Sequence, residues 1–415
     1  MSTRKRVVVT GMSGVCALGA SWQSVREGLR SGRSGITTIP AWESIEGLRT
    51  RLGAPVTALL DLEHFGRKKL RGMGRVACLA AQAAYAALAD AGLQGDARLS
   101  DGTLGLAFGS TSGSPPALVA YSRAFGIERS TKGIGPVDYL KLMSHTVAAN
   151  LAQLFEIRGR VIPTCSACTS GSQAIGAGME SILLGRQPVM LVGGAEELHE
   201  IESSVFDMLL ATSTRNDTPE QTPRPFDVDR DGLVVGEGAG ALVLEELEFA
   251  RSRGAKIQAE VLGYATSCDG LHLTSPDAVG MQRVIALALD DAGLASREID
   301  YVNAHATATR LGDEAESLAT HAVFGSRTPV SSLKGHMGHT LGACGALEAW
   351  CTIAMMNEGW VAPSLNLGRV DPRCAPLDYI TGQPRELVIR HAMSNNFAFG
   401  GVNTSLVFRR WDEAA

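Results

Sequence analysis

The segment Thr164-Cys165-Ser166-Ala167-Cys168-Thr169-Ser170-Gly171 is the part of the chain from which the fold can be argued outward. It follows the short apolar run Val161-Ile162 and opens a stretch rich in small residues. The pattern predicts a buried strand, a tight turn and a helix, because apolar residues then recur at the spacing of one helix face, at Ile175, Met179, Ile182 and Leu183. Cys168 would lie in the first turn of that helix. There the helix dipole is expected to lower the pKa of the thiol and favour the nucleophilic thiolate.

Two segments far downstream hold histidines that could serve this thiol. They are Asn303-Ala304-His305-Ala306-Thr307 and Lys334-Gly335-His336-Met337-Gly338-His339. His339 lies where a glycine-flanked loop enters a second small-residue helix, and a helix N-terminus disfavours the imidazolium, so we expect His339 to be neutral at pH 7. We also expect Lys334 and Glu348 to form an ion pair that positions this loop. One thiol and two separately presented imidazoles suit acyl transfer through a thioester.

Strands and helices alternate in two successive series, which predicts a layered α/β fold. The expected strands are 7–10, 104–108, 188–195, 257–264, 301–304 and 330–332, and the clearest helices are 76–91 and 281–292. Gly338-His339-Thr340-Leu341-Gly342-Ala343 weakly echoes Ala167-Cys168-Thr169-Ser170-Gly171-Ser172, which indicates two related halves. We place the boundary so that residues 1–254 carry the nucleophilic cysteine and residues 255–415 carry both catalytic histidines.

The composition limits the classes of protein that fit. With 415 residues, the chain is longer than one simple core supports, and 45% hydrophobic with 20% charged residues is typical of a globular protein. A formal charge of -5 argues against a nucleic-acid partner, and no apolar run reaches the roughly 18 residues that span a bilayer. The eight cysteines are irregularly spaced, so we expect the reducing cytoplasm and no disulfide scaffold.

Cys165-Ser166-Ala167-Cys168 also allows other interpretations. A zinc site would need four ligands, and the sequence has no second pair of closely spaced cysteines. A thioredoxin-like redox pair would also follow a strand at a helix start, but it leaves the two distant histidine segments without a role. Both cysteines could instead be buried structural thiols. Gly11-Met12-Ser13-Gly14 superficially resembles a dinucleotide-binding turn, but its third glycine is misplaced.

Taken together, these residues resemble the β-ketoacyl-[acyl-carrier-protein] synthases of the I/II type over essentially the whole chain. The other motifs that carry the resemblance are Pro225-Phe226-Asp227, Arg230-Asp231-Gly232, Gly236-Glu237-Gly238-Ala239-Gly240, Gly342-Ala343 and Phe399-Gly400-Gly401-Val402-Asn403. The resemblance implies a thiolase-like fold, in which two pseudo-repeated halves form a five-layered α-β-α-β-α arrangement. It further implies a homodimer, with a heterodimer of related subunits as the alternative.

The resemblance also implies a reaction and a set of site residues. Cys168 would take an acyl group from acyl carrier protein, and His305 and His339 would assist the decarboxylation of malonyl carrier protein, whose carbanion attacks the acyl group. No organic cofactor is required, because decarboxylation drives the reaction. Phe399 would supply an oxyanion-hole amide and a gate, while Lys334 and Glu348 support the histidines. Further implied contacts are the pantetheine contacts Thr307 and Thr309, the loop residue Gly400, and a structural monovalent cation at Asn303, Glu348 and Asn395.

Some positions depart from the family pattern. Ala306 replaces the usual glycine after His305, Ala398 replaces a glycine in the gate loop, and Leu233 replaces a frequent phenylalanine. Ser112 lies in a small polar loop where relatives often place a bulky pocket residue, so it and Phe206 are candidate walls of an altered acyl pocket. The amino-acid sequence around the gate loop resembles that of synthases from bacterial aryl polyene clusters, which use the same chemistry in a specialised polyketide pathway.

An acidic acyl carrier protein would require a basic docking surface. The candidate cluster is Lys68, Lys69, Arg71 and Arg75, next to Arg67, with Arg129 and Lys132 as additions; the alternative is a solvated helix face. Two other functions remain as rivals. A non-catalytic chain-length factor would lack the nucleophile, and a degradative thiolase would use a second catalytic cysteine with one histidine.

Overall fold

The computed structural model describes residues 4–58, 62 and 65–412. Within them, eleven strands form one mixed sheet in the order β12-β10-β9-β14-β15-β8-β1-β7-β6-β4-β5. These strands are β1 (Val7–Val15), β4 (Leu104–Gly109), β5 (Val161–Thr164), β6 (Val189–Glu196), β7 (Gly238–Glu246), β8 (Ala259–Cys268), β9 (Tyr301–Asn303), β10 (Pro329–Ser331), β12 (Asp378–Tyr379), β14 (His391–Phe397) and β15 (Val402–Arg410). Two small sheets pair β2 (Thr37–Thr38) with β3 (Leu52–Gly53), and β11 (Trp360–Val361) with β13 (Arg385–Glu386).

The strand order repeats between the two halves of the chain. The second half begins at the edge with the two-residue strand β12, which has no counterpart in the first half. Without it, the order toward the middle of the sheet is β10-β9-β14-β15-β8 in the second half and β5-β4-β6-β7-β1 in the first, which is the same order when these five strands of each half are numbered along the chain. In both halves the three outer strands are parallel and the inner ones antiparallel. The halves join where Val7–Val9 pairs with Ala259–Val261. The predicted pseudo-repeat is therefore present in the topology.

Helices separate and cover the two halves of the sheet. The α-helices are α1 (Trp22–Arg30), α2 (Arg67–Leu70), α3 (Arg75–Asp90), α4 (Pro115–Arg123), α5 (Pro136–Leu142), α6 (Thr146–Leu154), α7 (Ser170–Leu183), α8 (Glu200–Met208), α9 (Leu247–Ser252), α10 (Ala278–Ala292), α11 (Arg310–Phe324), α12 (Lys334–Met337) and α13 (Cys344–Glu358). Short 3-10 or π turns are η1 (Pro40–Ser44), η3 (Ala97–Leu99), η4 (Ala124–Glu128), η5 (Pro219–Gln221), η6 (Ser296–Glu298) and η7 (Leu341–Ala343).

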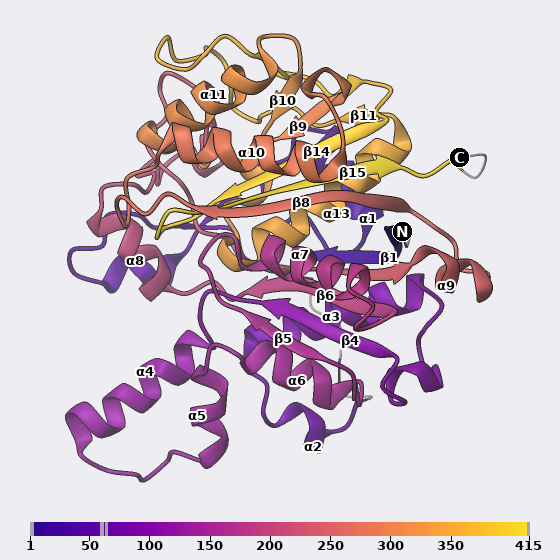
Figure 1. Ribbon diagram of the computed structural model, residues 1–415. Coiled ribbons are helices and arrows are strands. Elements are labelled where there is room, and N and C mark those ends of the chain that lie inside the picture. Colours follow the sequence, from indigo (N-terminus) through magenta and orange to yellow (C-terminus); the bar gives the residue numbers. More distant parts are fainter. Residues whose placement is uncertain (1–3, 59–61, 63–64, 413–415) are drawn as a thin grey trace.

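The layers follow the predicted α-β-α-β-α pattern (Figure 1). Helices α3 and α6 cover the outer face of the first half, and α10 with α11 covers the second. Helices α7 and α13 pack against each other between the halves. Strands β6 and β7 are buried almost throughout, because helices lie on both of their faces. None of the described helices has the length and hydrophobicity needed to cross a bilayer.

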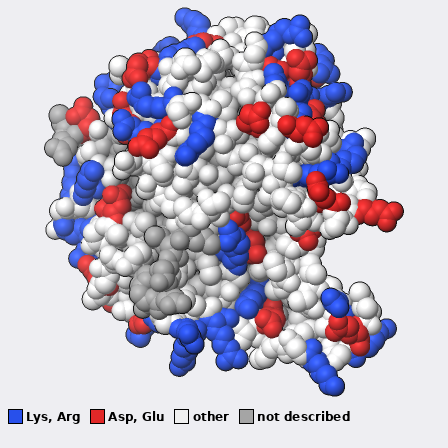
Figure 2. Space-filling view, turned by 180° about the vertical axis from the view of Figure 1, so that it is seen from behind, with Lys and Arg blue, Asp and Glu red and all other residues white. Residues whose placement is uncertain are grey.

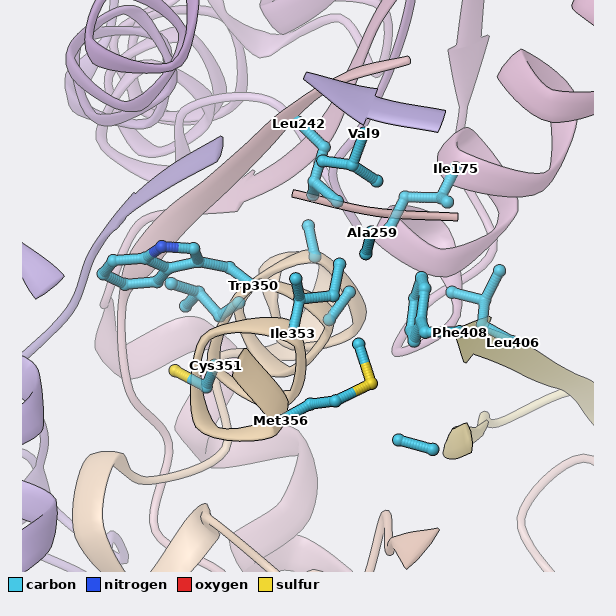
Figure 3. Close-up of a cluster of buried hydrophobic side chains, with 14 of the residues drawn as sticks. Val9, Ile175, Leu242, Ala259, Trp350, Cys351, Ile353, Met356, Leu406 and Phe408 are labelled. Carbon is cyan, nitrogen blue, oxygen red and sulfur yellow. The ribbon is translucent and has the colours of Figure 1, made fainter. Parts of the chain in front are cut away.

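The central helix α13 joins the cores of the two halves (Figure 3). Its residues Trp350, Ile353 and Met356 belong to one buried cluster with Val9 and Leu242 from the first half and Leu406 and Phe408 from the second. The neighbouring helix approaches closely, because a Cβ at Gly171 of α7 would lie 2.9 Å from the carbonyl oxygen of Gly342. Small residues at the starts of both helices therefore bring the two loops before them together.

Most sequence-predicted elements are confirmed to within a few residues, but the first strand differs. Strand β1 continues through Gly11-Met12-Ser13-Gly14 to Val15, so this segment forms no nucleotide-binding turn. The segment 115–142 forms an arm of α4, η4 and α5 that stands off the body (Figure 1), and from behind it is a lobe separated from the body by a notch (Figure 2). All eight cysteines are free, including Cys165 and Cys168.

Candidate active site

Cys168 lies in the turn between β5 and α7, two residues before the helix begins. The preceding Ala167 has φ of 49°, in the left-handed region that costs a non-glycine residue about 1–2 kcal/mol. The side chain of Cys168 is buried, whereas that of Cys165 is exposed and its thiol donates to the carbonyl of Thr111. The two thiols of the Cys165-Ser166-Ala167-Cys168 segment thus face different surroundings.

Two histidines meet the sulfur of Cys168. His305 follows β9, and His339 follows α12. The Nε2 atom of His339 lies 3.0 Å from the Cys168 Sγ, and the two imidazole rings are 5.1 Å apart and nearly perpendicular. The sulfur and one nitrogen of each ring all lie within 4.8 Å of one another. The fold therefore brings together the three side chains that the sequence predicts to converge.

The expectation that the pKa of Cys168 is lowered is wrong. The pKa of this thiol is raised to about 12, mainly by burial; the charge of Lys334 acts in the opposite direction, and the nearby Glu196 adds to the rise. Cys168 precedes the helix and is enclosed by protein, so loss of hydration outweighs the helix dipole. The resting site therefore holds a neutral thiol.

Both histidines are held neutral. Burial lowers the pKa of His305 and of His339 well below the ordinary value, and the positive charge of Lys334 lowers both further. His339 is neutral as predicted, but burial is the main cause. The Nδ1 atom of His305 faces the ammonium of Lys334 at 3.4 Å, and an ammonium can only donate, so the proton of His305 must lie on Nε2. The Nδ1 of His339 is buried without a hydrogen-bond partner among the described residues.

Lys334 and Glu348 form the expected ion pair, with 2.5 Å between Nζ and Oε1, and both side chains are buried. Burial would lower the pKa of Lys334, but Glu348 outweighs it and raises that pKa. Asn396 donates its side-chain amide to the other oxygen of Glu348 at 2.7 Å and lies 3.5 Å from Nδ1 of His305. Lys334, Glu348 and Asn396 therefore fix the orientation of the His305 ring from its Nδ1 side.

Other residues that sequence reasoning missed hold the reactive loops. Glu316 of α11 accepts the backbone N–H groups of His305 and Ala306 at 2.8 and 2.6 Å. Glu196, at the end of β6, accepts the N–H groups of Thr111 and Gly342. The thiol of Cys344 donates to the carbonyl oxygen of Cys168 at 3.2 Å. Their only sequence signal is a carboxylate or thiol inside an otherwise apolar or helical stretch.

A cavity of about 480 Å³ leads from the surface to Cys168, His305 and His339. Thr307, Thr309, Phe206 and Phe399 line it, as does Leu233, one of the departures from the family pattern. The ring of Phe206 lies 5.2 Å from that of Phe399 and 6.5 Å from that of His339. An apolar wall and a row of hydroxyls therefore surround the path to the sulfur.

Comparison with models of known protein families identifies the family of this chain. The model described as the beta-ketoacyl synthase N-terminal domain matches residues 4–250, and that of the C-terminal domain matches residues 258–368. This chain belongs to the beta-ketoacyl synthase family.

Individual relatives of the synthase cover its whole length. A 3-oxoacyl-[acyl-carrier-protein] synthase 1 of Haemophilus influenzae is 37% identical over 410 residues, which are 98% of this chain and 100% of that protein. A beta-ketoacyl synthase structure from Burkholderia phymatum STM815 superposes with a TM-score of 0.97 and 53% identity, covering 98% of this chain and 100% of that one. A ketosynthase solved with its type II polyketide acyl-carrier protein has a TM-score of 0.87 and 30% identity, covering 99% and 100%.

The predicted glycine turn lies between β14 and β15. Gly400 and Gly401 have φ of 86° and 71°, in the region where glycine is favoured. The N–H of Gly400 donates to the carbonyl of Leu273, and that of Ala398 to the carbonyl of Val402. Phe399, between them, faces the cavity.

Ser112 lies apart from the cavity lining of the synthase. Its hydroxyl donates to Glu202 at 3.3 Å, and burial raises the pKa of this carboxyl well above its ordinary value. Ser112 therefore borders an acidic group outside the cavity. Its role as an acyl-pocket wall remains a prediction.

The basic residues predicted to dock the carrier protein lie on several separate elements, and two of them already form ion pairs. Lys69 pairs with Glu156, and Arg75 pairs with the buried Glu237. Lys68 lies on α2, Arg71 directly follows it, and Arg129 and Lys132 follow η4 on the protruding arm. None of these described residues lines the cavity.

The predicted cation ligands of the synthase fit a metal ion only in part. The Oδ1 atom of Asn303 is buried without a hydrogen-bond partner among the described residues, and Asn303 lies beside Glu348. The Oδ1 of Asn395, in contrast, accepts the hydroxyl of Ser405 at 2.7 Å. The amide oxygen of Asn303 is available to a monovalent cation, and that of Asn395 has two lone pairs, of which Ser405 uses one. Both oxygens of Glu348 already accept hydrogen bonds, from Lys334 and Asn396.

Proposed function

We propose that the chain catalyses decarboxylative Claisen condensation, which joins an acyl group held on Cys168 to a malonyl unit and yields β-ketoacyl-acyl carrier protein in fatty acid elongation. The observation that carries this proposal is the convergence of one thiol and two neutral imidazoles at the buried end of a cavity. A chain-length factor would not keep this set, and a thiolase would not need the second histidine.

In the first step the thiol of Cys168 attacks the thioester carbonyl of the acyl donor. The S–C bond forms, the carrier sulfur leaves, and the thiol proton passes to the leaving sulfur. The leaving sulfur is the final acceptor of this proton, so loading does not depend on His339, whose Nε2 lies 3.0 Å from Sγ. Few thiolates exist at pH 7 when the pKa is about 12, so the proton leaves Sγ as the S–C bond forms.

In the second step the bond between the malonyl carboxylate and its α-carbon breaks, and CO₂ leaves. The electron pair forms an enolate, whose oxygen accepts hydrogen bonds from the imidazoles. His305 presents Nε2–H because Lys334 occupies its Nδ1 side, so Lys334 and Glu348 act as positioning residues.

In the third step the enolate carbon attacks the acyl carbon, the bond to Cys168 then breaks, and the thiolate that leaves takes up a proton from solvent, which restores the neutral thiol. We assign the oxyanion of the tetrahedral intermediate to the amides of Cys168 and Phe399. Each such donor is worth about 2.7–4 kcal/mol in related sites. The amide of Cys168 already faces its own sulfur. Phe399 and Gly400 form the gate, and Thr307 and Thr309 face the incoming pantetheine arm.

The substrates would arrive on acyl carrier protein, and the chain would work as a homodimer in the cytoplasm. Support for a dimer comes from apolar side chains on the edge strand β5 and on the arm, where Val161 is 42% and Ile127 79% exposed. Eight free cysteines are consistent with a reducing compartment.

A specialised polyketide pathway, such as aryl polyene formation, is the second candidate. It is favoured by the structural similarity to a ketosynthase described as bound to a hexaketide. The chemistry at Cys168 would be the same, and only the acyl chain would differ. Phe206, which lines the cavity, is the residue that we propose to set this choice, while the role of Ser112 stays a prediction because it lies outside this cavity.

The test is a condensation assay with acyl- and malonyl-carrier proteins, in which β-ketoacyl product and CO₂ are measured separately. Cys168→Ala should give no β-ketoacyl product. His339→Ala should still load acyl groups but lose most condensation. Product formation by Cys168→Ala, or unchanged condensation by His339→Ala, would contradict the mechanism. A panel of saturated and polyunsaturated acyl donors would distinguish the two pathways.

A further inference from the structure

Exposed leucines surround the mouth of the active-site cavity. Leu209 and Leu210 follow α8, Leu273 comes from the loop between β8 and α10, and Leu311 lies in the first turn of α11. Their exposed fractions are 46%, 70%, 75% and 64%, and we call these four residues the leucine collar. Large exposed aliphatic groups gathered from three separate segments are typical of an interaction surface.

One positively charged side chain, that of Arg310, lies among these leucines. Arg310 is the only lysine or arginine that lines the cavity within the described part of the chain, and its guanidinium has no ion-pair partner there. Its backbone carbonyl accepts the guanidinium of Arg230 at 2.9 Å, which fixes the start of α11. Asp231, which also lines the cavity, pairs with Arg215 at 3.6 Å and accepts hydrogen bonds from Ser213 and from the N–H of Thr214. Arg310 is therefore free to bind an anion at the mouth.

A carrier-bound substrate places a specific demand on this mouth. The acyl thioester is at one end of the phosphopantetheine arm, and the arm is joined to the carrier protein through a phosphodiester. When the thioester reaches Cys168, the carrier surface around the root of the arm must lie against the rim of the cavity. The residues that form this rim are the leucine collar and Arg310.

We propose that the leucine collar docks the acyl carrier protein through apolar contacts and that Arg310 binds the phosphodiester of its arm. The proposal rests on the proposed function, because it requires a carrier-bound substrate. It differs from docking on the basic residues around α2, of which Lys69 and Arg75 are already paired with Glu156 and Glu237. Apolar docking is little screened by salt, whereas docking on a basic patch weakens strongly as salt rises.

The experiment compares two acyl donors at low and high salt. One is acyl carrier protein, and the other is an acyl N-acetylcysteamine thioester, which has neither carrier nor phosphate. We expect Leu210→Asp and Leu273→Asp each to lower kcat/KM for the carrier substrate about tenfold more than for the small thioester, mainly through KM. The matched control is Val388→Asp, because Val388 is 77% exposed and lies outside the cavity lining. It should behave as the unmodified protein.

A second pair of acyl donors tests whether Arg310 binds the phosphate. Acyl-phosphopantetheine and acyl-pantetheine differ only in the phosphate, and the unmodified protein should prefer the phosphorylated donor. Arg310→Gln should abolish that preference. If Arg310→Gln keeps the preference, the phosphate does not bind there.

Other results would overturn collar docking. Equal losses for carrier and small donors would place the leucines in the acyl site, and a changed molecular mass in light scattering would make the collar a contact between copies. A large carrier-specific loss in Lys68→Glu with none in the collar variants would move docking to α2. Failure of the unmodified protein to become acylated by either donor would instead refute the proposed function.

Discussion

Cys168 and its neighbours show how burial sets the chemistry of single residues. The same enclosure that raises the pKa of the thiol keeps His305 and His339 neutral, and Lys334 is a positive charge that acts on all three. A neutral thiol beside a neutral imidazole can become reactive when substrate arrives, while remaining protonated at rest. At rest the site therefore contains a neutral thiol and two neutral imidazoles, not a thiolate–imidazolium pair.

Alkylation of Cys168 by iodoacetamide tests this protonation state. Because burial raises the pKa to about 12, the rate should rise roughly tenfold per pH unit up to pH 9.5 without a plateau. The measurement is the mass-spectrometric rate of modification of the peptide containing Cys168. A plateau near pH 7 would show a lowered pKa and contradict this account.

The Lys334–Glu348 pair allows a stability prediction. Lys334→Met should leave a buried carboxylate without its partner and lower the free energy of unfolding by about 3–5 kcal/mol. The double variant Lys334→Met with Glu348→Gln should recover much of this loss, since no isolated charge remains. Urea unfolding followed by circular dichroism gives both values. Equal stability of the single and double variants would mean that the pair is not charged.

At the level of elements, the strand-turn-helix around Cys168 and the turn between β14 and β15 follow from local sequence, because periodicity and paired glycines encode them. The end of β1 was mispredicted, since Gly11 and Gly14 pack inside the sheet, where a Cβ on Gly11 would meet α3 at 2.3 Å. Glu316 and Glu196 could not be found locally, because their partners are loops from other elements.

The two glycines of the gate loop allow a matched comparison. Gly400→Ala has room, so its cost should be the backbone strain alone, about 1 kcal/mol. In Gly401→Ala the new Cβ would also lie 3.0 Å from Cβ of Asp269, which already holds Asn403, so we expect at least about 2 kcal/mol. The change in melting temperature ranks them, and the reverse order would contradict the loop geometry.

At the scale of the molecule, two halves of the same topology place α7 and α13 side by side in the central layer. The loops that precede these helices deliver Cys168 from one half and His339 from the other. The weak sequence echo predicts this arrangement. The leucine collar could not be predicted in the same way, because its members come from three segments whose proximity only the fold creates.

The dimer proposal is tested by the edge strand β5. The unmodified protein should have twice the monomer mass of 43.7 kDa in light scattering. Val161→Lys should shift it toward the monomer, because a charge on an edge strand opposes pairing with a second strand. Val388→Lys, at an exposed site away from β5, is the control. A dimer unaffected by Val161→Lys would place the interface elsewhere.

The most direct measurement of the central claim is peptide mapping by mass spectrometry after incubation with an acyl-carrier protein thioester alone. We expect the acyl mass on the peptide containing Cys165 and Cys168, fragmentation that assigns it to Cys168, and loss of the adduct in Cys168→Ala. An adduct that maps to Cys165 or Cys344, or one that persists in Cys168→Ala, would contradict the assignment of the nucleophile.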